Sequence, residues 1–278
     1  MSDKQIALVT GASRGIGASI ALHLAQQGFV VIGTATSDDG AAKISQALSA
    51  FPGSRGANLN VNDAAAGEAL IDAIVKEHGG LQVLVNNAGM VQTGKSVKRA
   101  KLGGLSDADW AHHMALNIGV TFHCIRAALP AMQAAGYGRI VNIGSVSSVR
   151  PQPGNSAYVA AKHGVVGLTK TGSLEYAPHG IRVNAVLPGA IDTPMLRGAL
   201  DQSGYTEADF APALSLFGRF GRPDEVGEAS AWLCSACCAS RRLDSARASV
   251  RSTTICSTRL PRPITSRWSA ISAISDIR

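Results

Sequence analysis

The sequence predicts an α/β protein, a single domain built on a doubly wound parallel sheet with helices on both faces. Short apolar, β-branched runs alternate with longer helical patterns, which is typical of βαβ units. Several runs are apolar throughout, as expected for strands that helices cover on both sides. Glycine is frequent, with 30 of 278 residues, while aromatic residues make up only 5%, and this favours close backbone approaches over a β-sandwich.

Six strands are expected, each a short apolar run that a helical pattern follows. In chain order the runs are Ile6–Val9, Val30–Gly33, Asn58–Val61, Leu81–Val85, Arg139–Ile143 and Ile181–Val186. The helical patterns fill 15–27, 40–50, 64–78, 107–135, 156–177 and 223–234. Pro188-Gly189 and Pro223 interrupt the later segments and mark loops. The polar, lysine-rich stretch 90–106 is expected to be an exposed loop beside the site.

The basic character of the chain is confined to its last part. The formal net charge is +7, but residues from Ala236 onward hold eight arginines, no lysine and two aspartates. The first 235 residues are nearly neutral, with 18 basic and 17 acidic side chains, so we expect no nucleic-acid partner for them. No run of eighteen apolar residues and no secretory signal at MSDKQIALVTGA are found, which predicts no membrane span and a cytoplasmic location.

A glycine-rich turn follows the first expected strand. It reads Thr10-Gly11-Ala12-Ser13-Arg14-Gly15-Ile16-Gly17 and leads into the first expected helix. Glycines allow a sharp turn and a close backbone approach to a pyrophosphate, and the helix N-terminus offers unpaired N–H groups to its oxygens. A strand before the turn and a helix after it predict a dinucleotide site and a Rossmann-type sheet.

The motifs resemble those of one family. The turn is similar to the TGxxxGxG pattern of short-chain dehydrogenases/reductases, and Asn86-Asn87-Ala88-Gly89 resembles their NNAG motif. ALVTGASRGIG, VIGTATS and NIGSVSS look closest to the bacterial 3-oxoacyl-[acyl-carrier-protein] reductases, and the resemblance spans residues 5–235. It implies cofactor contacts from Gly11, Ser13, Arg14, Gly15, Ile16, Gly17, Thr36, Asn60, Val61, Asn87, Ala88, Gly89, Pro188, Gly189, Ile191 and Thr193, together with Tyr158 and Lys162.

The end of the second strand indicates which nicotinamide cofactor is bound. It reads Gly33-Thr34-Ala35-Thr36-Ser37, without the carboxylate that would accept the ribose 2′-OH of NAD and repel a 2′-phosphate. Arg14 could pair with that phosphate instead. NADP(H) is therefore favoured, although Asp38 and Asp39 follow closely and leave NAD(H) open.

Four polar residues are candidates for catalysis. Tyr158 and Lys162 lie four residues apart on an expected helix, so they share one face, and the ammonium should lower the pKa of the phenol. Ser145 ends the fifth strand, at the edge where open α/β sheets bind ligands. Asn117 lies within an expected helix, where asparagine is unfavourable.

These four residues match the family's catalytic Asn-Ser-Tyr-Lys set. The resemblance implies hydride transfer from the nicotinamide to a carbonyl carbon, with Tyr158 as proton donor and Ser145 orienting the carbonyl. Lys162 would also hold the nicotinamide ribose, and Asn117 would hold a water of a proton relay. Pro188-Gly189 and Ile191-Asp192-Thr193 resemble the segment that contacts the carboxamide.

The substrate stays open at this point. A 3-oxoacyl thioester, carried by acyl carrier protein or coenzyme A, is one alternative. The turn 133–138 is poor in charge, however, and Lys95, Lys98, Arg99 and Lys101 would have to provide the basic surface for a carrier protein. LEYAPHGIRVNAVLPGAIDTPM also resembles the alcohol, sugar and steroid dehydrogenases that act on small molecules. A catalytically impaired NADP-binding protein is the alternative from another class.

Residues 236–278 do not resemble the family. The last 51 residues contain no glycine, whereas the family ends on a glycine-containing strand. We interpret 1–235 as the NADP-binding reductase domain and 236–278 as a disordered Ser/Arg-rich tail that arose from a reading-frame shift near Ser235. The final strand should be missing or replaced, weakening a family-typical homotetramer. No metal site is expected, because Cys234, Cys237, Cys238 and Cys256 lack a second pair and no other cluster has ligand spacing.

Overall fold

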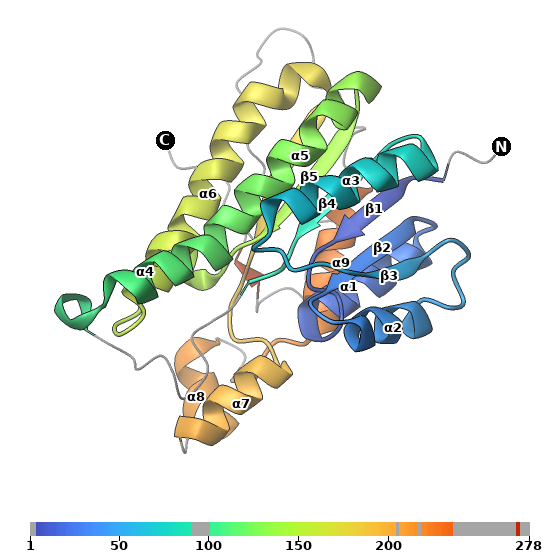
Figure 1. Ribbon diagram of the computed structural model, residues 1–278. Coiled ribbons are helices and arrows are strands. Elements are labelled where there is room, and N and C mark those ends of the chain that lie inside the picture. The colour runs from blue at the N-terminus through green and yellow to red at the C-terminus, as the bar shows by residue number, and fades with distance from the viewer. Residues whose placement is uncertain (1–3, 90–100, 204–205, 216–217, 236–270, 273–278) are drawn as a thin grey trace, which may run out of the picture.

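The computed structural model describes residues 4–89, 101–203, 206–215, 218–235 and 271–272. The predictions made for Lys95, Lys98, Arg99 and most of the tail lie outside these residues. The described chain folds into one sheet with helices on both of its faces, as Figure 1 shows, which confirms the predicted α/β class.

The strands of the sheet run in the order β3-β2-β1-β4-β5-β6-β7. Their bounds are β1 (Ile6–Val9), β2 (Val30–Ala35), β3 (Arg55–Asn58), β4 (Val83–Asn86), β5 (Gly138–Ile143), β6 (Ile181–Pro188) and β7 (Ile271–Ser272). From β3 to β6 all neighbouring strands pair in parallel. Strands β1 to β3 lie on one side of the sheet and β4 to β6 on the other, so the direction of the strand order reverses between the neighbours β1 and β4. Open α/β sheets bind ligands at such a switch point.

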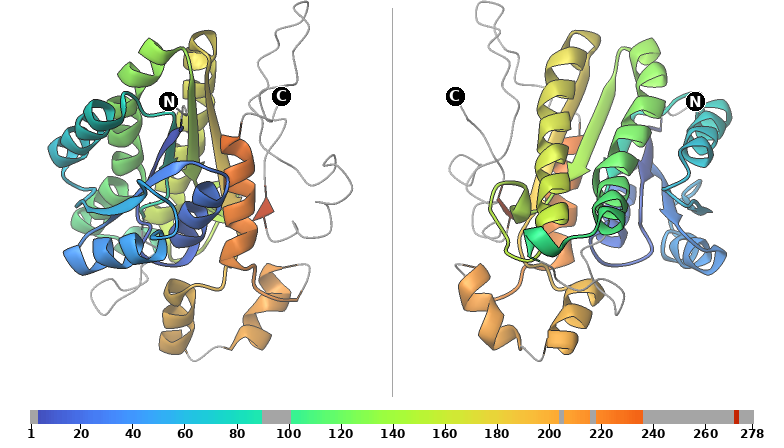
Figure 2. Two further views of the ribbon diagram at one scale, coloured as in Figure 1. Left: turned by 90° about the vertical axis from the view of Figure 1, so that its right-hand side faces the viewer. Right: turned by 60° about the vertical axis from the view of Figure 1, so that its left-hand side comes forward.

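The helices form two layers. They are α1 (Gly15–Gln26), α2 (Asp38–Ala47), α3 (Ala64–His78), α4 (Asp107–Met114), α5 (Val120–Ala135), α6 (Ser156–Tyr176), α7 (Pro194–Ser203), α8 (Glu207–Leu214) and α9 (Pro223–Cys234). One hydrophobic core joins α1, α2 and α9 to the sheet, and the other joins α3 and α5 to its opposite face. Figure 2 shows α9 lying beside α1.

The residues of β1 contribute to both cores in turn. Ala7 and Val9 belong to the core under α1 and α9, whereas Ile6 and Leu8 belong to the core under α3 and α5. Successive side chains of a strand point to opposite faces, so a strand that is covered on both faces is apolar at every position. This arrangement explains the uninterrupted run that predicted the strand.

Strand β3 lies three residues earlier than the sequence predicted. The expected strand was Asn58–Val61, but residues 55–58 pair with β2, with Ile32 opposite Arg55. RGAN has little apolar character, and it forms a strand because β2 offers its backbone groups at this edge. Asn60 and Val61 therefore lie in the turn between β3 and α3.

The expected helix 107–135 is three segments in the structure. A π-helical turn, Ala115–Gly119, separates α4 from α5. Helices α7 and α8 were not predicted from the sequence. Their signals were capping residues, because Thr193 Oγ1 accepts a hydrogen bond from the Leu196 amide and Thr206 forms a reciprocal capping box with Asp209.

The last described strand, β7, is short and antiparallel to β6, with Pro188 opposite Ile271. This agrees with the expectation that the family's final strand would be missing or replaced. Cys234 ends α9 and is fully buried in the core under α1 and α9. Among the described helices none is both long and apolar enough to cross a membrane.

Candidate active site

Four of the predicted site segments lie at the carboxyl ends of parallel strands. The glycine turn follows β1, Asn87 follows β4, Ser145 follows β5, and residues 189–193 follow β6. Because parallel strands present their carboxyl ends at one edge of the sheet, segments far apart in the sequence meet there.

The glycine turn needs glycine for two different reasons. Gly11 and Gly15 adopt φ values of +68° and +58°, which residues with a side chain rarely adopt. At Gly17 the obstacle is space, since a Cβ would lie 2.1 Å from the Gly11 carbonyl oxygen and 2.4 Å from Asn87 Nδ2. Helix α1 therefore starts against the backbone of the turn, which leaves its first N–H groups beside the loop.

The segment after β4 holds the turn in place. Asn87 Nδ2 donates to the carbonyl oxygens of Thr10 and Gly11 at 3.0 and 2.9 Å. The backbone amides of Asn87 and Ala88 both donate to Thr10 Oγ1 at 3.0 Å. Thr10 is thus a positioning residue that the sequence analysis did not assign, although the threonine before the first glycine was its signal.

The start of α1 suits the phosphates of a dinucleotide. In the described chain no side chain caps this helix and no acidic residue occupies its first turn, so its N–H groups and partial positive charge face the loop. Arg14 is the N-cap residue of α1 and is exposed, whereas Ser13 and Ile16 are partly buried beside it. The cradle formed where Cβ atoms are absent fits a pyrophosphate.

The residues expected near the adenosine end are less closely connected. Thr36 and Asn60 are exposed after β2 and β3, and Val61 packs partly buried against the α3 side. The Asp38 carboxylate accepts a hydrogen bond of 2.7 Å from Asn58 Nδ2. This hydrogen bond engages the Asp38 carboxylate, the group that had left NAD(H) open as the cofactor.

Tyr158 and Lys162 lie on the buried face of α6, one turn apart. Each side chain is only 6% exposed. The Lys162 ammonium donates a 2.9 Å hydrogen bond to the carbonyl oxygen of Ile143, and it lies 5.8 Å from the centre of the Tyr158 ring. The spacing thus brings the two side chains together, as predicted, and fastens α6 to the end of β5.

Ser145 joins this pair from the turn after β5. It is the N-cap of a short helical turn, Val146–Ser148, and its hydroxyl accepts a hydrogen bond from the Ser147 amide at 3.1 Å. Ser148 Oγ in turn accepts from the Ser145 amide at 3.1 Å. The Ser145 hydroxyl lies near enough to Tyr158 to act on the pKa of the phenol, so the two hydroxyl groups predicted to act on one substrate atom are close together.

The electrostatics of the pair correct one expectation. Burial raises the pKa of Tyr158 above its ordinary value, and the hydrogen bond from Ser145 only partly opposes this rise. Burial also lowers the pKa of Lys162 to about 8. The spacing of the two residues had predicted that the ammonium lowers the pKa of the phenol, but loss of hydration is the largest effect on the pKa of both groups.

Asn117 lies in the π-helical turn and is buried, at 1% exposure. Its Nδ2 donates to the His113 carbonyl oxygen at 3.2 Å. A Cβ on Gly89 would lie 3.1 Å from Asn117 Oδ1 and 3.5 Å from Lys162 Nζ, so the amide and the ammonium approach the same point beside the NNAG segment. The π-helical turn thus places Asn117 beside Gly89 and Lys162, which accounts for an asparagine at a position that looked unfavourable in a regular helix.

The segment after β6 closes the glycine turn from the other side. Pro188 ends β6, Gly189 follows it, and buried Ile191 forms a bridge with Gly221. The Thr193 methyl group lies 3.2 Å from the position of a Cβ on Gly15. The predicted contact segment and the predicted phosphate turn are therefore neighbours.

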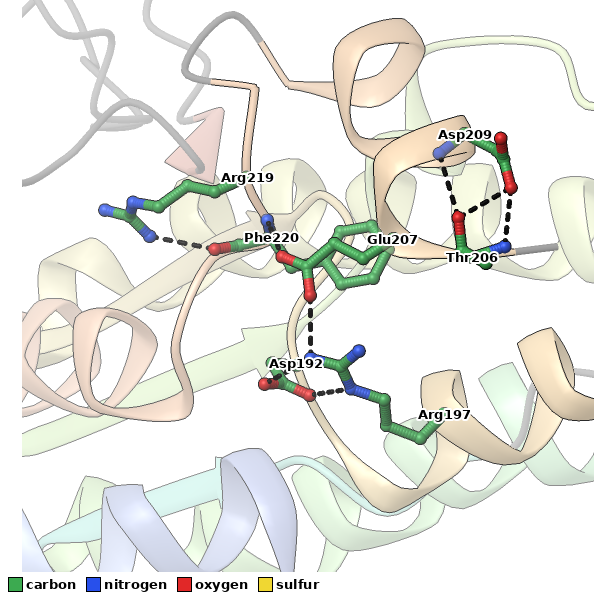
Figure 3. Close-up of polar contacts among 7 residues, drawn as sticks. All are labelled: Asp192, Arg197, Thr206, Glu207, Asp209, Arg219 and Phe220. Atoms are coloured by element: carbon green, nitrogen blue, oxygen red, sulfur yellow. Dashed lines mark hydrogen bonds and ion pairs between the residues drawn. The ribbon is translucent and has the colours of Figure 1, made fainter.

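Ion pairs fix this segment to α7 and α8. Figure 3 shows Arg197 between the carboxylates of Asp192 and Glu207, with distances of 2.6 and 2.8 Å. Arg197 keeps the pKa of Asp192 below its ordinary value. Glu207 also accepts from the Phe220 amide at 3.2 Å, so Asp192, which the sequence placed near the carboxamide, acts here as an anchor of the surrounding helices.

Comparisons with known proteins identify similar sequences and structures. The chain is 40% identical over 231 residues to the 3-oxoacyl-[acyl-carrier-protein] reductase of Vibrio cholerae, covering 83% of this chain and 90% of the relative. The solved structure of ElxO with NADP bound superposes with a TM-score of 0.77 at 30% identity, over 84% and 92% of the two chains. The aldohexose dehydrogenase of Thermoplasma acidophilum gives 0.73 at 34%, over 84% and 88%.

A family model supplies the remaining evidence. The model described as short chain dehydrogenase matches residues 5–204, which include the glycine turn, the NNAG segment and the Ser145, Tyr158 and Lys162 positions. The chain belongs to the short-chain dehydrogenase family.

Proposed function

We propose that this protein is an NADPH-dependent reductase that converts a carbonyl group to a hydroxyl group. The observation that carries the proposal is the meeting of Ser145, Tyr158 and Lys162 beside a glycine turn that fits a pyrophosphate. The family, and the similar structure of ElxO with NADP bound, support the same cofactor here.

The side chains divide the work as follows. When bound, the nicotinamide supplies the hydride. The Ser145 hydroxyl donates a hydrogen bond to the carbonyl oxygen and holds it beside Tyr158. The raised pKa keeps Tyr158 protonated near neutral pH, so its hydroxyl delivers a proton to the oxygen as negative charge develops there. The Lys162 ammonium, close to Asn117 Oδ1, adds positive charge on the same side of the site.

We further propose that the substrate is a 3-oxoacyl thioester. Several relatives near 40% identity bear the name 3-oxoacyl-[acyl-carrier-protein] reductase and match 83% of this chain, which supports that class. The carrier protein is then a partner. The basic side chains proposed to contact it include Lys101, which is exposed.

A second candidate is a dehydrogenase of small alcohols or sugars. The 34% identity to an aldohexose dehydrogenase over most of both chains favours this alternative. Turnover of carrier-bound acetoacetyl groups, acetoacetyl-CoA and glucose, each measured with its cofactor, separates the two. A preference for glucose would contradict the thioester proposal.

The decisive experiment measures the loss of NADPH absorbance with acetoacetyl-CoA. Tyr158→Phe should lower kcat by about 1,000-fold, because the proton donor is removed while the ring is kept. Tyr176→Phe, at the other end of α6, is the matched control and should keep wild-type activity. Unchanged activity in Tyr158→Phe, or wild-type protein inactive toward every carbonyl compound tried, would contradict the proposed function.

A further inference from the structure

The side chain of Asn155 is a buried amide without a hydrogen bond. It is 3% exposed, and both Oδ1 and Nδ2 lack a partner in the described structure. An unpaired buried amide is unfavourable, because its oxygen and nitrogen have lost their hydrogen bonds to water and form none with the protein. Such a group is rare in a native protein and calls for a specific explanation.

The position of Asn155 argues against a purely local role. It is the N-cap residue of α6, where an asparagine side chain commonly accepts hydrogen bonds from the second or third amide of the helix. Here those amides belong to Ala157 and Tyr158, and the Asn155 side chain makes no such bond. The residue therefore does not serve as the cap that its type and position would allow.

The surroundings of Asn155 are those of the candidate active site. Tyr158 lies three residues later on the same first turn of α6. The Asn155 amide donates to the Gln152 carbonyl oxygen at 3.2 Å, and Gln152 Oε1 accepts from Ser147 Oγ at 3.0 Å. Ser147 belongs to the turn that Ser145 caps. Both Asn155 and Tyr158 are buried, so the Asn155 side chain lies beneath the surface near the phenol that acts on the substrate.

We infer that Asn155 is a substrate-binding residue that recognises a second oxygen of the substrate, beyond the carbonyl that is reduced. Its Nδ2 donates to the thioester carbonyl of a 3-oxoacyl group, two carbon atoms from the reacting carbonyl. This assignment rests on the proposed function and explains how one site distinguishes a 1,3-dicarbonyl compound from a simple ketone. A site built to donate a hydrogen bond discriminates strongly against a molecule that lacks the acceptor.

The test compares two substrates and two variants. With acetoacetyl-CoA, Asn155→Leu should lower kcat/KM by about 10- to 100-fold, because Leu has a similar size and no donor. With 2-heptanone, which has one carbonyl group, the change should stay below about threefold. Asn155→Ala, which adds no bulk, should show the same difference between the substrates.

Thermal unfolding provides a readout that does not depend on activity. Asn155→Leu should keep or raise the Tm of the free protein, because an unsatisfied amide is removed. Asn142→Leu is the matched control and should lower the Tm, because Asn142 bonds Asn86 and Thr169 at 2.9 Å each. A Tm that falls equally in both variants would mean that Asn155 is bonded for structural reasons, and this would overturn the inference.

The kinetic outcomes keep the two proposals apart. Equal losses with acetoacetyl-CoA and 2-heptanone in an active enzyme overturn the role of Asn155 and leave the reductase function intact. A wild-type enzyme without a preference for acetoacetyl-CoA over 2-heptanone does the same. Wild-type protein inactive toward both compounds contradicts the proposed function itself.

Discussion

Removing the buried ammonium of Lys162 should stabilise the protein while abolishing its activity. Lys162 is 6% exposed, and burial lowers its pKa from 10.5 to about 8. One pKa unit corresponds to about 1.4 kcal/mol, so holding the charged form inside the fold costs about 3 kcal/mol. The hydrogen bond to the Ile143 carbonyl oxygen offsets about 1 kcal/mol of this cost. Lys162→Met, which keeps a similar length, should therefore raise the free energy of unfolding at pH 7 by about 2 kcal/mol.

The pH dependence of unfolding gives a sharper test than a single value. Above pH 10.5 Lys162 is neutral in both states and burial carries no charge penalty. Between pH 10.5 and about 8 the unfolded state binds the proton and the folded state does not, so wild-type stability falls as the pH falls. Below pH 8 the full penalty is present. Lys162→Met lacks this term, and its advantage over wild type should shrink steadily from pH 8 to pH 10.5.

Urea unfolding followed by circular dichroism at pH 7, 8, 9 and 10 measures both quantities. Lys170→Met, a partly buried lysine on the same helix, is the control and should keep the wild-type pH dependence, because Lys162 remains in place. The reasoning is refuted if Lys162→Met is less stable than wild type at pH 7 and the difference is the same at pH 10. A stabilised but inactive variant would show that the site keeps an unfavourable charge for its chemistry.

Three further predictions concern the turn, the hydroxyl pair and the tail. Gly17→Ala should destabilise the fold by about 3 kcal/mol, because a Cβ at this position would lie 2.1 Å from a backbone oxygen atom. It should also weaken NADPH binding, measured by fluorescence. The control Gly67→Ala has open space around the added Cβ and should be neutral or stabilising by up to about 1 kcal/mol. Ser145→Ala should lower kcat by about 100-fold. It should also raise the pKa of Tyr158 in the pH profile of kcat/KM, because the hydrogen bond from Ser145 that lowers this pKa is lost. A pKa that falls in the variant would argue against this assignment. Translating the gene in its other two frames beyond the codon for Ser235 should restore a glycine-containing final strand, and if neither frame does so the frame-shift hypothesis fails.

The chain's local patterns predicted those parts of the fold that depend on local chemistry. β1, α3 and α9 begin and end where the sequence placed them, because apolar runs, capping residues and Pro223 act over a few residues. The glycine spacing predicted the turn for the same reason, since positive φ at Gly11 and Gly15 is a property of the residue itself.

Other features depended on neighbours that the sequence does not identify. The position of β3 is set by pairing with β2, and a polar edge segment carries no pattern of its own. The π-helical turn at Asn117 follows from packing between α4 and α6, which no periodicity reveals.

The same distinction between local sequence and tertiary structure applies to the candidate site. The resemblance to the family led to the prediction that Ser145, Tyr158 and Lys162 act together, and the structure places the three side chains near one another. Only the tertiary structure decided how these groups are charged, since burial depends on everything that surrounds a side chain. Water is excluded from Tyr158 and Lys162 by segments from distant parts of the chain, and this exclusion, more than the spacing of the two residues, determines their pKa values.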